Sequence, residues 1–344
     1  MRVLKFIGKA LLLLVLLIAG LITYVVTCLP KVAPADQSVK VEITPARVAR
    51  GEYLAKNVAA CMGCHSIRQW DILGHPVKPG TEFMGGEPLF GPAIGLPGVI
   101  PPKNLTPYHL KDYSDGELVR VLRTGVRKDG QPLFPFMPYQ AIGEMEQEDL
   151  YSVIAYLRSG VKEIKNDVPE HQLQPPLNVI VHTIPKDAPA YPTPVDRKDT
   201  VAYGKYLVRM GSCADCHSPV DAHHQPLPGL YLSGGQEFPY LNSKLQKHPQ
   251  GGVLRVPNIT PDIETGIGSW TKAQFIARFA EWRGKKLEEK HKAKLDLDKG
   301  DYVPLMPYAE YAGMTDADLG AIYDYLHQIP AVKNAVVRFE PPKL

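Results

Sequence analysis

Cys61-Met62-Gly63-Cys64-His65 is the stretch around which the chain is organised, and Cys213-Ala214-Asp215-Cys216-His217 repeats its pattern. Cys-x-x-Cys-His is the attachment sequence for c-type haem. Two thiols one helical turn apart can bond to the two vinyl groups of one porphyrin, and the adjacent imidazole can ligate the iron. The sequence therefore predicts two covalently bound haem c groups, attached through Cys61, Cys64, Cys213 and Cys216, with His65 and His217 as axial ligands.

Two other interpretations of these cysteines are weaker. A redox-active Cys-x-x-Cys pair does not require the following histidine, which is present in both copies. A zinc site typically has its two cysteine pairs about 15–20 residues apart. Here the pairs are far apart, and each begins its own repeat.

Length and composition fit a two-domain electron-transfer protein better than a nucleic-acid binder. The chain has 344 residues and a formal net charge of +3, which is enough length for two domains. Its 33 prolines and 29 glycines suit loop-rich domains around a prosthetic group. No basic run is interleaved with aromatic residues, so we expect no nucleic-acid partner. Of the five cysteines only Cys28 lies outside the motifs, so no disulfide framework remains.

The N-terminal segment is apolar from Ala10 to Val26 and follows three basic residues. Positive charge before an apolar run keeps the N-terminus cytoplasmic and exports the rest. We interpret residues 1–29 as a membrane anchor, with the soluble domains on the periplasmic side of the bacterial inner membrane, where haem is attached covalently. A signal sequence cleaved near Ala35 and an acylated Cys28 are the alternatives.

The remaining chain is a duplication. We predict a polar spacer at 30–45, a cytochrome c domain at 46–165, a proline-rich extended linker at 166–198 and a second cytochrome c domain at 199–344. The predicted fold is mostly α: two tandem class I cytochrome c domains behind one N-terminal transmembrane helix. Residues 46–165 are called the first repeat below, and residues 199–344 the second repeat.

Each repeat carries the same helix signals. Gly51-Glu52-Tyr53-Leu54 and Gly204-Lys205-Tyr206-Leu207 predict helices that lead into the haem motifs, and Ser114 and Thr271 are predicted N-caps. Each repeat ends in an amphipathic helix, with apolar faces formed by Leu150, Val153, Ile154 and Leu157 and by Leu319, Ile322, Tyr323 and Leu326. We expect these final helices to pack on the helices that carry Tyr53 and Tyr206.

The sixth iron ligand is predicted from a second repeated motif, Met-Pro-Tyr. Met137 and Met306 fall at matching places, after the capped helix and before the last helix. A thioether ligand makes an electron-transfer haem with a raised reduction potential, whereas a vacant position makes an enzyme. The other histidines lack matched partners, so we expect surface or loop positions for His75, His109, His171, His182, His223, His224, His248, His291 and His327.

These motifs together resemble the membrane-bound cytochrome c subunit of bacterial alcohol, aldehyde and gluconate dehydrogenases. The resemblance rests on the haem motifs, on Asn258-Ile259-Thr260-Pro261, on Gly266 to Trp270 and on Met306 to Tyr308. Those subunits usually carry three haem motifs, and this chain has two. The resemblance implies that Trp270, Asn104 and Asn258 pack around the haem edges.

The predicted function is that of a membrane-anchored dihaem cytochrome c. It would relay single electrons between a periplasmic dehydrogenase or quinol-linked donor and a downstream acceptor or oxidase, without being an enzyme itself. The alternative is a dihaem cytochrome c peroxidase, which needs one iron that can open its distal side. Extra residues at 284–300 of the second repeat are rich in lysine. We interpret them as a solvated loop or short surface helix, with partner docking as the alternative.

Overall fold

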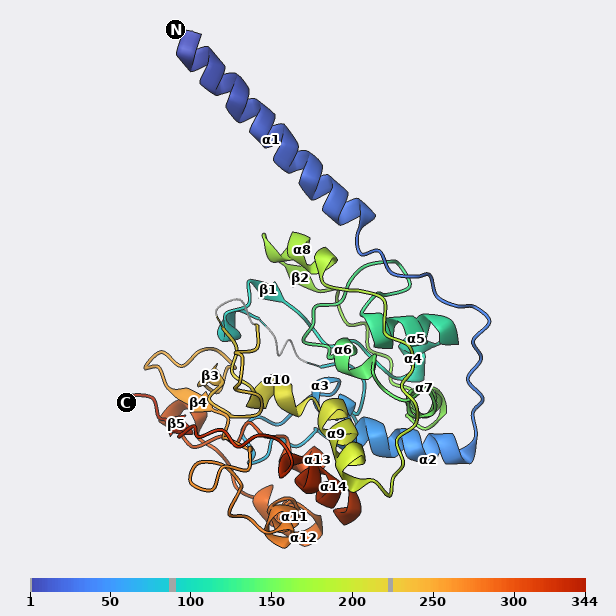
Figure 1. The fold of residues 1–344 in the computed structure, drawn as a ribbon, viewed down its shortest axis with the longest axis vertical. Helices are drawn as coiled ribbons and strands as arrows, with labels where there is room; N and C mark the ends of the chain where they lie inside the picture. The colour runs from blue at the N-terminus through green and yellow to red at the C-terminus, as the bar shows by residue number, and fades with distance from the viewer. Residues whose placement is uncertain (1, 87–90, 222–224) are drawn as a thin grey trace. The chain divides into compact units, whose positions relative to one another are not determined.

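The computed structural model describes residues 2–86, 91–221 and 225–344. Helices predominate among these residues and the strands are short, so the chain is mostly α, as predicted (Figure 1). The chain forms two compact units. The first comprises Met1–Lys40, Tyr113–Glu144 and Gln172–Ala190, and the second comprises Val41–Asp112, Met145–His171 and Tyr191–Leu344. Both haem motifs therefore belong to the second unit, whereas Met137 belongs to the first.

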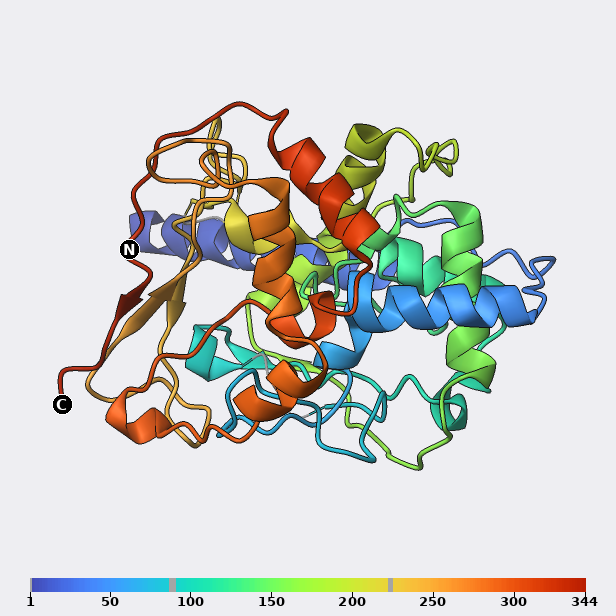
Figure 2. The same cartoon turned by 90° about the horizontal axis from the view of Figure 1, so that it is seen from below.

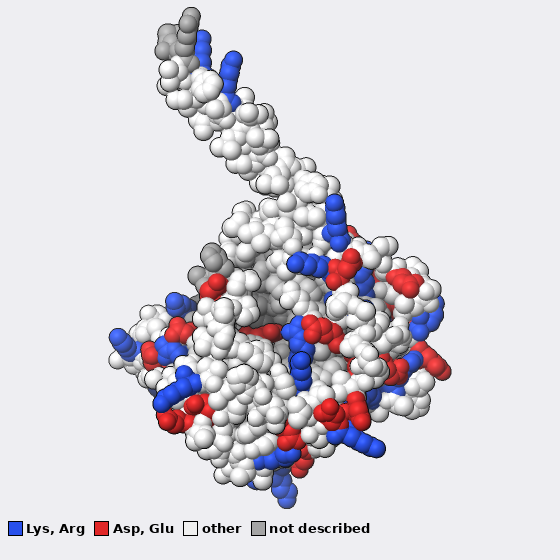
Figure 3. Space-filling model, viewed as in Figure 1, with Lys and Arg blue, Asp and Glu red and all other residues white. Residues whose placement is uncertain are grey.

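Helix α1 (Arg2–Cys28) of the first unit is the one helix in the described part of the chain that is long and apolar enough to cross a membrane. Its mean hydropathy is 2.7. Figure 3 shows charged side chains on α1 only towards its N-terminal end. A membrane anchor and an export signal share these properties, so α1 is one or the other.

The end of α1 is held by residues of the predicted linker. The segment forms α8 (Leu177–Ile180) and η3 (Val181–Thr183), and ring Nδ1 of His182 lies 3.1 Å from the carbonyl oxygen of Leu29. The prediction of an extended linker without helix is therefore wrong for these residues. Pro176 stands at the N-cap of α8, where its missing N–H is not needed, so a proline-rich segment can still form a helical turn.

The other elements of the first unit are α5 (Asp115–Thr124), α6 (Tyr139–Ile142) and β2 (Gln172–Leu173). The predicted cap of α5 is confirmed, because Ser114 and Glu117 form a capping box. The helix ends at Gly125, whose φ of 73° lies in the left-handed region. The ring of the buried Tyr139 covers this glycine, which places the start of α6 against the end of α5.

In the second unit, the first repeat supplies seven elements. They are α2 (Pro45–Tyr53), the π-helical turn η1 (Leu54–Val58), α3 (Cys61–Cys64), η2 (Pro92–Ile94), β1 (Gly98–Val99), α4 (Pro107–Leu110) and α7 (Gln147–Ser159). The helix predicted to lead into the first haem motif is confirmed, since α2 continues through η1 towards α3. The predicted apolar face of α7 is buried as well.

The second repeat supplies ten elements. They are α9 (Thr200–Met210), α10 (Cys213–His217), β3 (Glu237–Pro239), β4 (Val253–Arg255), α11 (Lys272–Ala280), α12 (Gly284–Lys290), η4 (Leu297–Lys299), α13 (Tyr308–Tyr311), α14 (Asp316–Leu326) and β5 (Phe339–Glu340). The strands form one antiparallel sheet in the order β3-β4-β5, with Leu254 opposite both Phe238 and Phe339. Thr271 forms the predicted cap, in a capping box with Gln274.

Each repeat is built on a close crossing of its first and last helices. Helix α2 (blue) crosses α7 (green) in Figure 2, and α9 packs on α14 in the same way. The crossings are close because each has a glycine at the contact. A Cβ atom on Gly51 would lie 1.9 Å from the carbonyl oxygen of Ser152, and one on Gly204 would lie 1.9 Å from that of Ala321. The predicted packing of these helices is therefore confirmed.

The two repeats exchange reciprocal hydrogen bonds within the second unit. Tyr53 Oη donates to Asp318 Oδ2 at 2.5 Å, and Tyr206 Oη donates to Asp149 Oδ2 at 2.7 Å. The two tyrosines are equivalent in the repeats, as are the two aspartates. Each aspartate is buried, so the bonds satisfy carboxylates that water does not reach well. Tyr53 and Tyr206 therefore join the two repeats.

Residues 284–300 join the repeats a second time. Helix α12 is a short surface helix, as predicted. The residues after it pair with the first repeat. The amide of Leu73 donates to the carbonyl oxygen of Ala293 at 3.0 Å, and the amide of Leu295 donates to that of Asp71 at 2.8 Å. This backbone pairing fixes the end of the lysine-rich segment, so the segment is not a free loop.

Candidate haem-binding sites

The two haem motifs have the same local structure. Each begins a one-turn helix, α3 or α10, directly after a residue in the left-handed conformation, Ala60 with φ 47° or Ser212 with φ 50°. Helical spacing places the two cysteines of each motif on one face. The four motif cysteines are free thiols in this structure.

The motif cysteines differ in exposure, because Cys61 and Cys213 are half-buried and Cys64 and Cys216 are exposed. The side chains of Cys64 and Cys216 are exposed, yet burial within the fold raises the pKa of both thiols, for Cys216 to about 11. Burial raises the pKa of Cys61 and of Cys213 to about 12. All four thiols are therefore protonated at neutral pH.

The two motif histidines are oriented by backbone carbonyls. Nδ1 of His65 lies 2.6 Å from the carbonyl oxygen of Lys103, and Nδ1 of His217 lies 2.9 Å from that of Pro257. Burial lowers the pKa of both imidazoles, for His217 to about 4, so both rings are neutral. With the proton on Nδ1, the lone pair of Nε2 is available to an iron atom, as in other histidine metal ligands.

These carbonyls are held in place by the repeated Asn-x-Thr-Pro segments. Asn104, directly after Lys103, donates through Nδ2 to the carbonyl oxygen of Ile164 at 2.9 Å. Asn258, directly after Pro257, donates to that of Val332 at 2.7 Å. Both asparagines are buried and tie this segment to the chain that follows the last helix of their repeat. Sequence reasoning missed the orienting carbonyls because they belong to the backbone, but the repeated asparagine marks their position.

The two candidate methionine ligands lie in separate turns that have the same hydrogen bond. The amide of Tyr139 donates to the carbonyl oxygen of Met137 at 2.7 Å, and that of Tyr308 donates to Met306 at 2.7 Å. Both methionine side chains are half-buried, whereas Met145, Met210 and Met314 are buried in the core. Met306 belongs to the same compact unit as His65 and His217, and Met137 belongs to the other. Iron ligation by either methionine remains a prediction.

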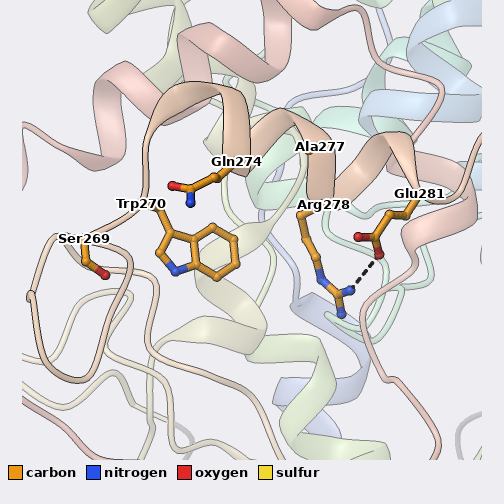
Figure 4. A pocket seen from close by; sticks show the side chains of 6 residues that line it. All are labelled: Ser269, Trp270, Gln274, Ala277, Arg278 and Glu281. Carbon is orange, nitrogen blue, oxygen red and sulfur yellow. Dashed lines mark hydrogen bonds and ion pairs between the residues drawn. The ribbon is translucent and has the colours of Figure 1, made fainter.

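Trp270 lines a pocket together with Arg278. A pocket of about 460 Å³ is lined by Ser269, Trp270, Gln274, Ala277, Arg278 and Glu281 (Figure 4). Arg278 pairs with Glu281 at 3.2 Å, and its guanidinium carbon lies 4.8 Å from the ring centre of Tyr308. This pocket therefore borders the Met-Pro-Tyr turn of the second repeat. The role of Trp270 at a haem edge remains a prediction.

The expectation of surface or loop positions is wrong for His182, which is buried in η3, whereas His75 and His248 lie in loops. His75, His182 and His248 are buried. His75 packs on Trp70 with 5.0 Å between ring centres. Burial, assisted by the charge of Arg68, lowers the pKa of His75 to about 4. Their lack of partners across the repeat did not reveal burial, because burial depends on contacts made by each repeat separately. His223 and His224 lie outside the described residues.

Comparison with known proteins identifies the relatives of the chain. It is 28% identical over 294 residues to the fructose dehydrogenase cytochrome subunit of Gluconobacter japonicus, covering 83% of this chain and 53% of that protein. It is 30% identical over 237 residues to the gluconate 2-dehydrogenase cytochrome c subunit of Pantoea cypripedii, covering 66% and 49%. The chain is homologous to the cytochrome c subunits of membrane-bound dehydrogenases.

Shorter similarity extends to other cytochromes. A diheme cytochrome c-type protein of Cereibacter sphaeroides is 30% identical over 132 residues, covering 38% of this chain and 37% of that protein. No model of a known protein family matches the chain. The chain spans about half the length of the dehydrogenase cytochrome subunits named above. Those subunits are electron carriers and not catalytic subunits, and the homology implies that this chain carries covalent haem c.

Proposed function

We propose that the chain is a membrane-anchored dihaem cytochrome c that relays single electrons. The proposed donor is a periplasmic dehydrogenase or a quinol-linked protein, and the proposed acceptor is a downstream carrier or oxidase. The observation that supports this most directly is the duplicated histidine geometry, with Nδ1 of His65 and of His217 each at a backbone carbonyl. A single site could serve many chemistries, but two equivalent sites suit transfer from one to the other.

Each haem would be held by residues of its own repeat. Cys61 and Cys64 would form the thioethers of one haem, and Cys213 and Cys216 those of the other. His65 and His217 would ligate the irons on one side. Met137 and Met306 would complete the coordination, and a thioether ligand favours the ferrous state. A bound haem supplies one-electron chemistry, because its iron alternates between ferrous and ferric states.

The protein's own contribution is to position these ligands and to exclude water. Neutral imidazoles, held by Lys103 and Pro257 through their carbonyl oxygens, need no proton movement when the iron changes its charge. The close helix crossings at Gly51 and Gly204 keep each motif in a rigid frame. Little reorganisation is then required for electron transfer. Helix α1 would keep the sites near the membrane that holds the partner proteins.

Haem counting tests the proposal most directly. Mass spectrometry of the mature protein should show two haem additions that survive acid-acetone extraction, and reductive titration should consume two electrons per chain. One addition or none would contradict the dihaem assignment. Purification in mild detergent should then recover a dehydrogenase or an oxidase with the chain. Rapid turnover of hydrogen peroxide by the purified protein would instead favour the peroxidase alternative.

A further inference from the structure

A buried ion pair joins the two repeats beside the first haem motif. Arg68, from the first repeat, pairs with Glu310 in α13 of the second repeat at 2.6 Å. The exposed fraction of the two side chains is 11% and 4%. Both residues belong to the second compact unit. Neither was singled out from the sequence.

Arg68 is fixed against the first attachment helix. Its Nε atom donates to the carbonyl oxygen of Gly63, between the two motif cysteines, at 2.6 Å. Its Nη1 atom donates to the carbonyl oxygen of His75 at 3.1 Å. The guanidinium therefore cannot move away from the motif without leaving buried carbonyl groups unpaired.

Glu310 is fixed by the segment that contacts the second haem motif. It is four residues after Met306, in the same turn. The next residue, Tyr311, donates from Oη to the carbonyl oxygen of Gly211 at 2.7 Å, just before the second motif. In the described structure Oε2 of Glu310 has no hydrogen-bond partner. One short segment thus places a carboxylate between the two attachment motifs.

The pair has no counterpart at the other site. Val220 occupies the place after His217 that Arg68 occupies after His65, and Ala141 occupies the place after Met137 that Glu310 occupies after Met306. The duplication therefore provides nearly the same ligands twice but this charge pair only once. Two haems with the same ligands have different reduction potentials only if their surroundings differ.

We propose that Arg68 and Glu310 set the reduction potential of the haem bound at Cys61 and Cys64 apart from that of the second haem. Arg68 would raise this potential, because a nearby positive charge disfavours ferric iron, and Glu310 would lower it. Charges in a buried, low-dielectric setting act strongly on one another. The proposal rests on the proposed function, since it requires two haems. The ion pair would thereby favour one direction of electron transfer between the two haems.

Spectroelectrochemical titration of the full-length holoprotein tests this proposal. Glu310→Gln keeps the shape of the side chain and removes its charge. The potential of the first haem should rise, by about 59 mV for a tenfold change in its one-electron equilibrium constant, while that of the second haem changes less. Glu340→Gln is the matched control, because Glu340 pairs with Arg255 but is exposed. It should shift neither potential.

The double variant Arg68→Gln/Glu310→Gln protects the test against misfolding, because it leaves no unpaired buried charge. Because Arg68 is hydrogen-bonded directly to the attachment helix at Gly63, loss of its charge should outweigh loss of the Glu310 charge, and the first potential should then fall relative to the second. The Met306→Ala variant shows which of the two reduction steps belongs to the second haem, because it removes the proposed ligand of that haem. Unchanged potentials, equal shifts of both haems, or shifts opposite to these overturn the proposal. A haem count other than two by mass spectrometry would overturn the proposed function instead, and the potentials would not be needed to show it.

Discussion

Tyr53 donates a hydrogen bond of 2.5 Å to Asp318, a residue 265 positions further along the chain. The equivalent bond in the opposite direction joins Tyr206 to Asp149. Burial raises the pKa of both tyrosines well above the ordinary value, and the neighbouring carboxylates add to this. Both hydroxyls therefore remain protonated donors. The two repeats consequently stabilise each other through polar contacts that neither repeat can make alone.

Removing either hydroxyl should destabilise the protein. Tyr53→Phe or Tyr206→Phe leaves a buried carboxylate with one bond fewer, and hydrogen bonds to charged groups contribute about 1.5–3 kcal/mol. We expect the free energy of unfolding in urea to fall by about that amount. Tyr108→Phe is the control, because Tyr108 bonds to Asp167 at the exposed surface. Equal losses of unfolding free energy at the buried and exposed sites would show that the bonds between the repeats stabilise the protein no more than a surface hydrogen bond does.

Adding a methyl group at either helix crossing should be more disruptive. Gly51→Ala and Gly204→Ala would place Cβ 1.9 Å from a carbonyl oxygen, so the helices must separate. Overpacking of this kind typically costs about 1–3 kcal/mol, and occasionally more. Gly320→Ala, in α14, is the control, because its nearest neighbour would be 3.5 Å away. Thermal unfolding should show a lowered midpoint for the first two variants and an unchanged or raised one for the third.

Loss of a methionine ligand should open one iron. Met137→Ala and Met306→Ala should each allow carbon monoxide to bind one reduced haem and should lower the potential of that haem. The wild-type protein should bind carbon monoxide poorly. Met145→Leu is the control, because Met145 is buried in the core. Ready binding by the reduced wild-type protein would refute ligation by both methionines and would support the peroxidase alternative.

The buried His75 should make stability depend on pH. Its pKa of about 4 in the folded protein lies below the ordinary 6.5, so the unfolded chain binds the proton more readily. Stability is therefore complete above pH 6.5 and falls as the pH drops towards 4, by about 3 kcal/mol at most. His75→Asn removes this titration and tolerates the positive φ of 47°. Its unfolding free energy should vary less over that range; an identical slope would contradict the assignment.

The haem motifs, helix caps and apolar helix faces could be predicted because each depends on residues close in sequence. Ser114 and Thr271 cap their helices within one turn, and α7 buries the face that its own period indicates. The contacts between repeats could not be predicted in this way. Asp149 and Asp318 fit equally well as first-turn acids that favour a helix dipole. Their burial depends on tyrosines in the other repeat, and no local sequence pattern identifies a partner so far along the chain.

The same contrast between local and distant contacts applies around the first haem motif. His65 is oriented through Lys103, within its own repeat, but Arg68 beside it depends on Glu310. Charge patterns did not reveal this pair, because a single arginine and a single glutamate are common on any surface. Only the comparison of equivalent positions, Val220 and Ala141, shows that the pair is particular to one site.

The reciprocal bonds also fix an order of events during synthesis. The first repeat is made before Tyr206 and Asp318, and under the proposed function it is also exported before them, so Asp149 and Tyr53 must wait for their partners. Closing so large a loop is slow relative to local helix formation. The first haem motif is therefore exposed in an unfinished fold for longer than the second. Under the proposed function, that interval gives haem attachment at Cys61 and Cys64 time to occur before the chain closes around them.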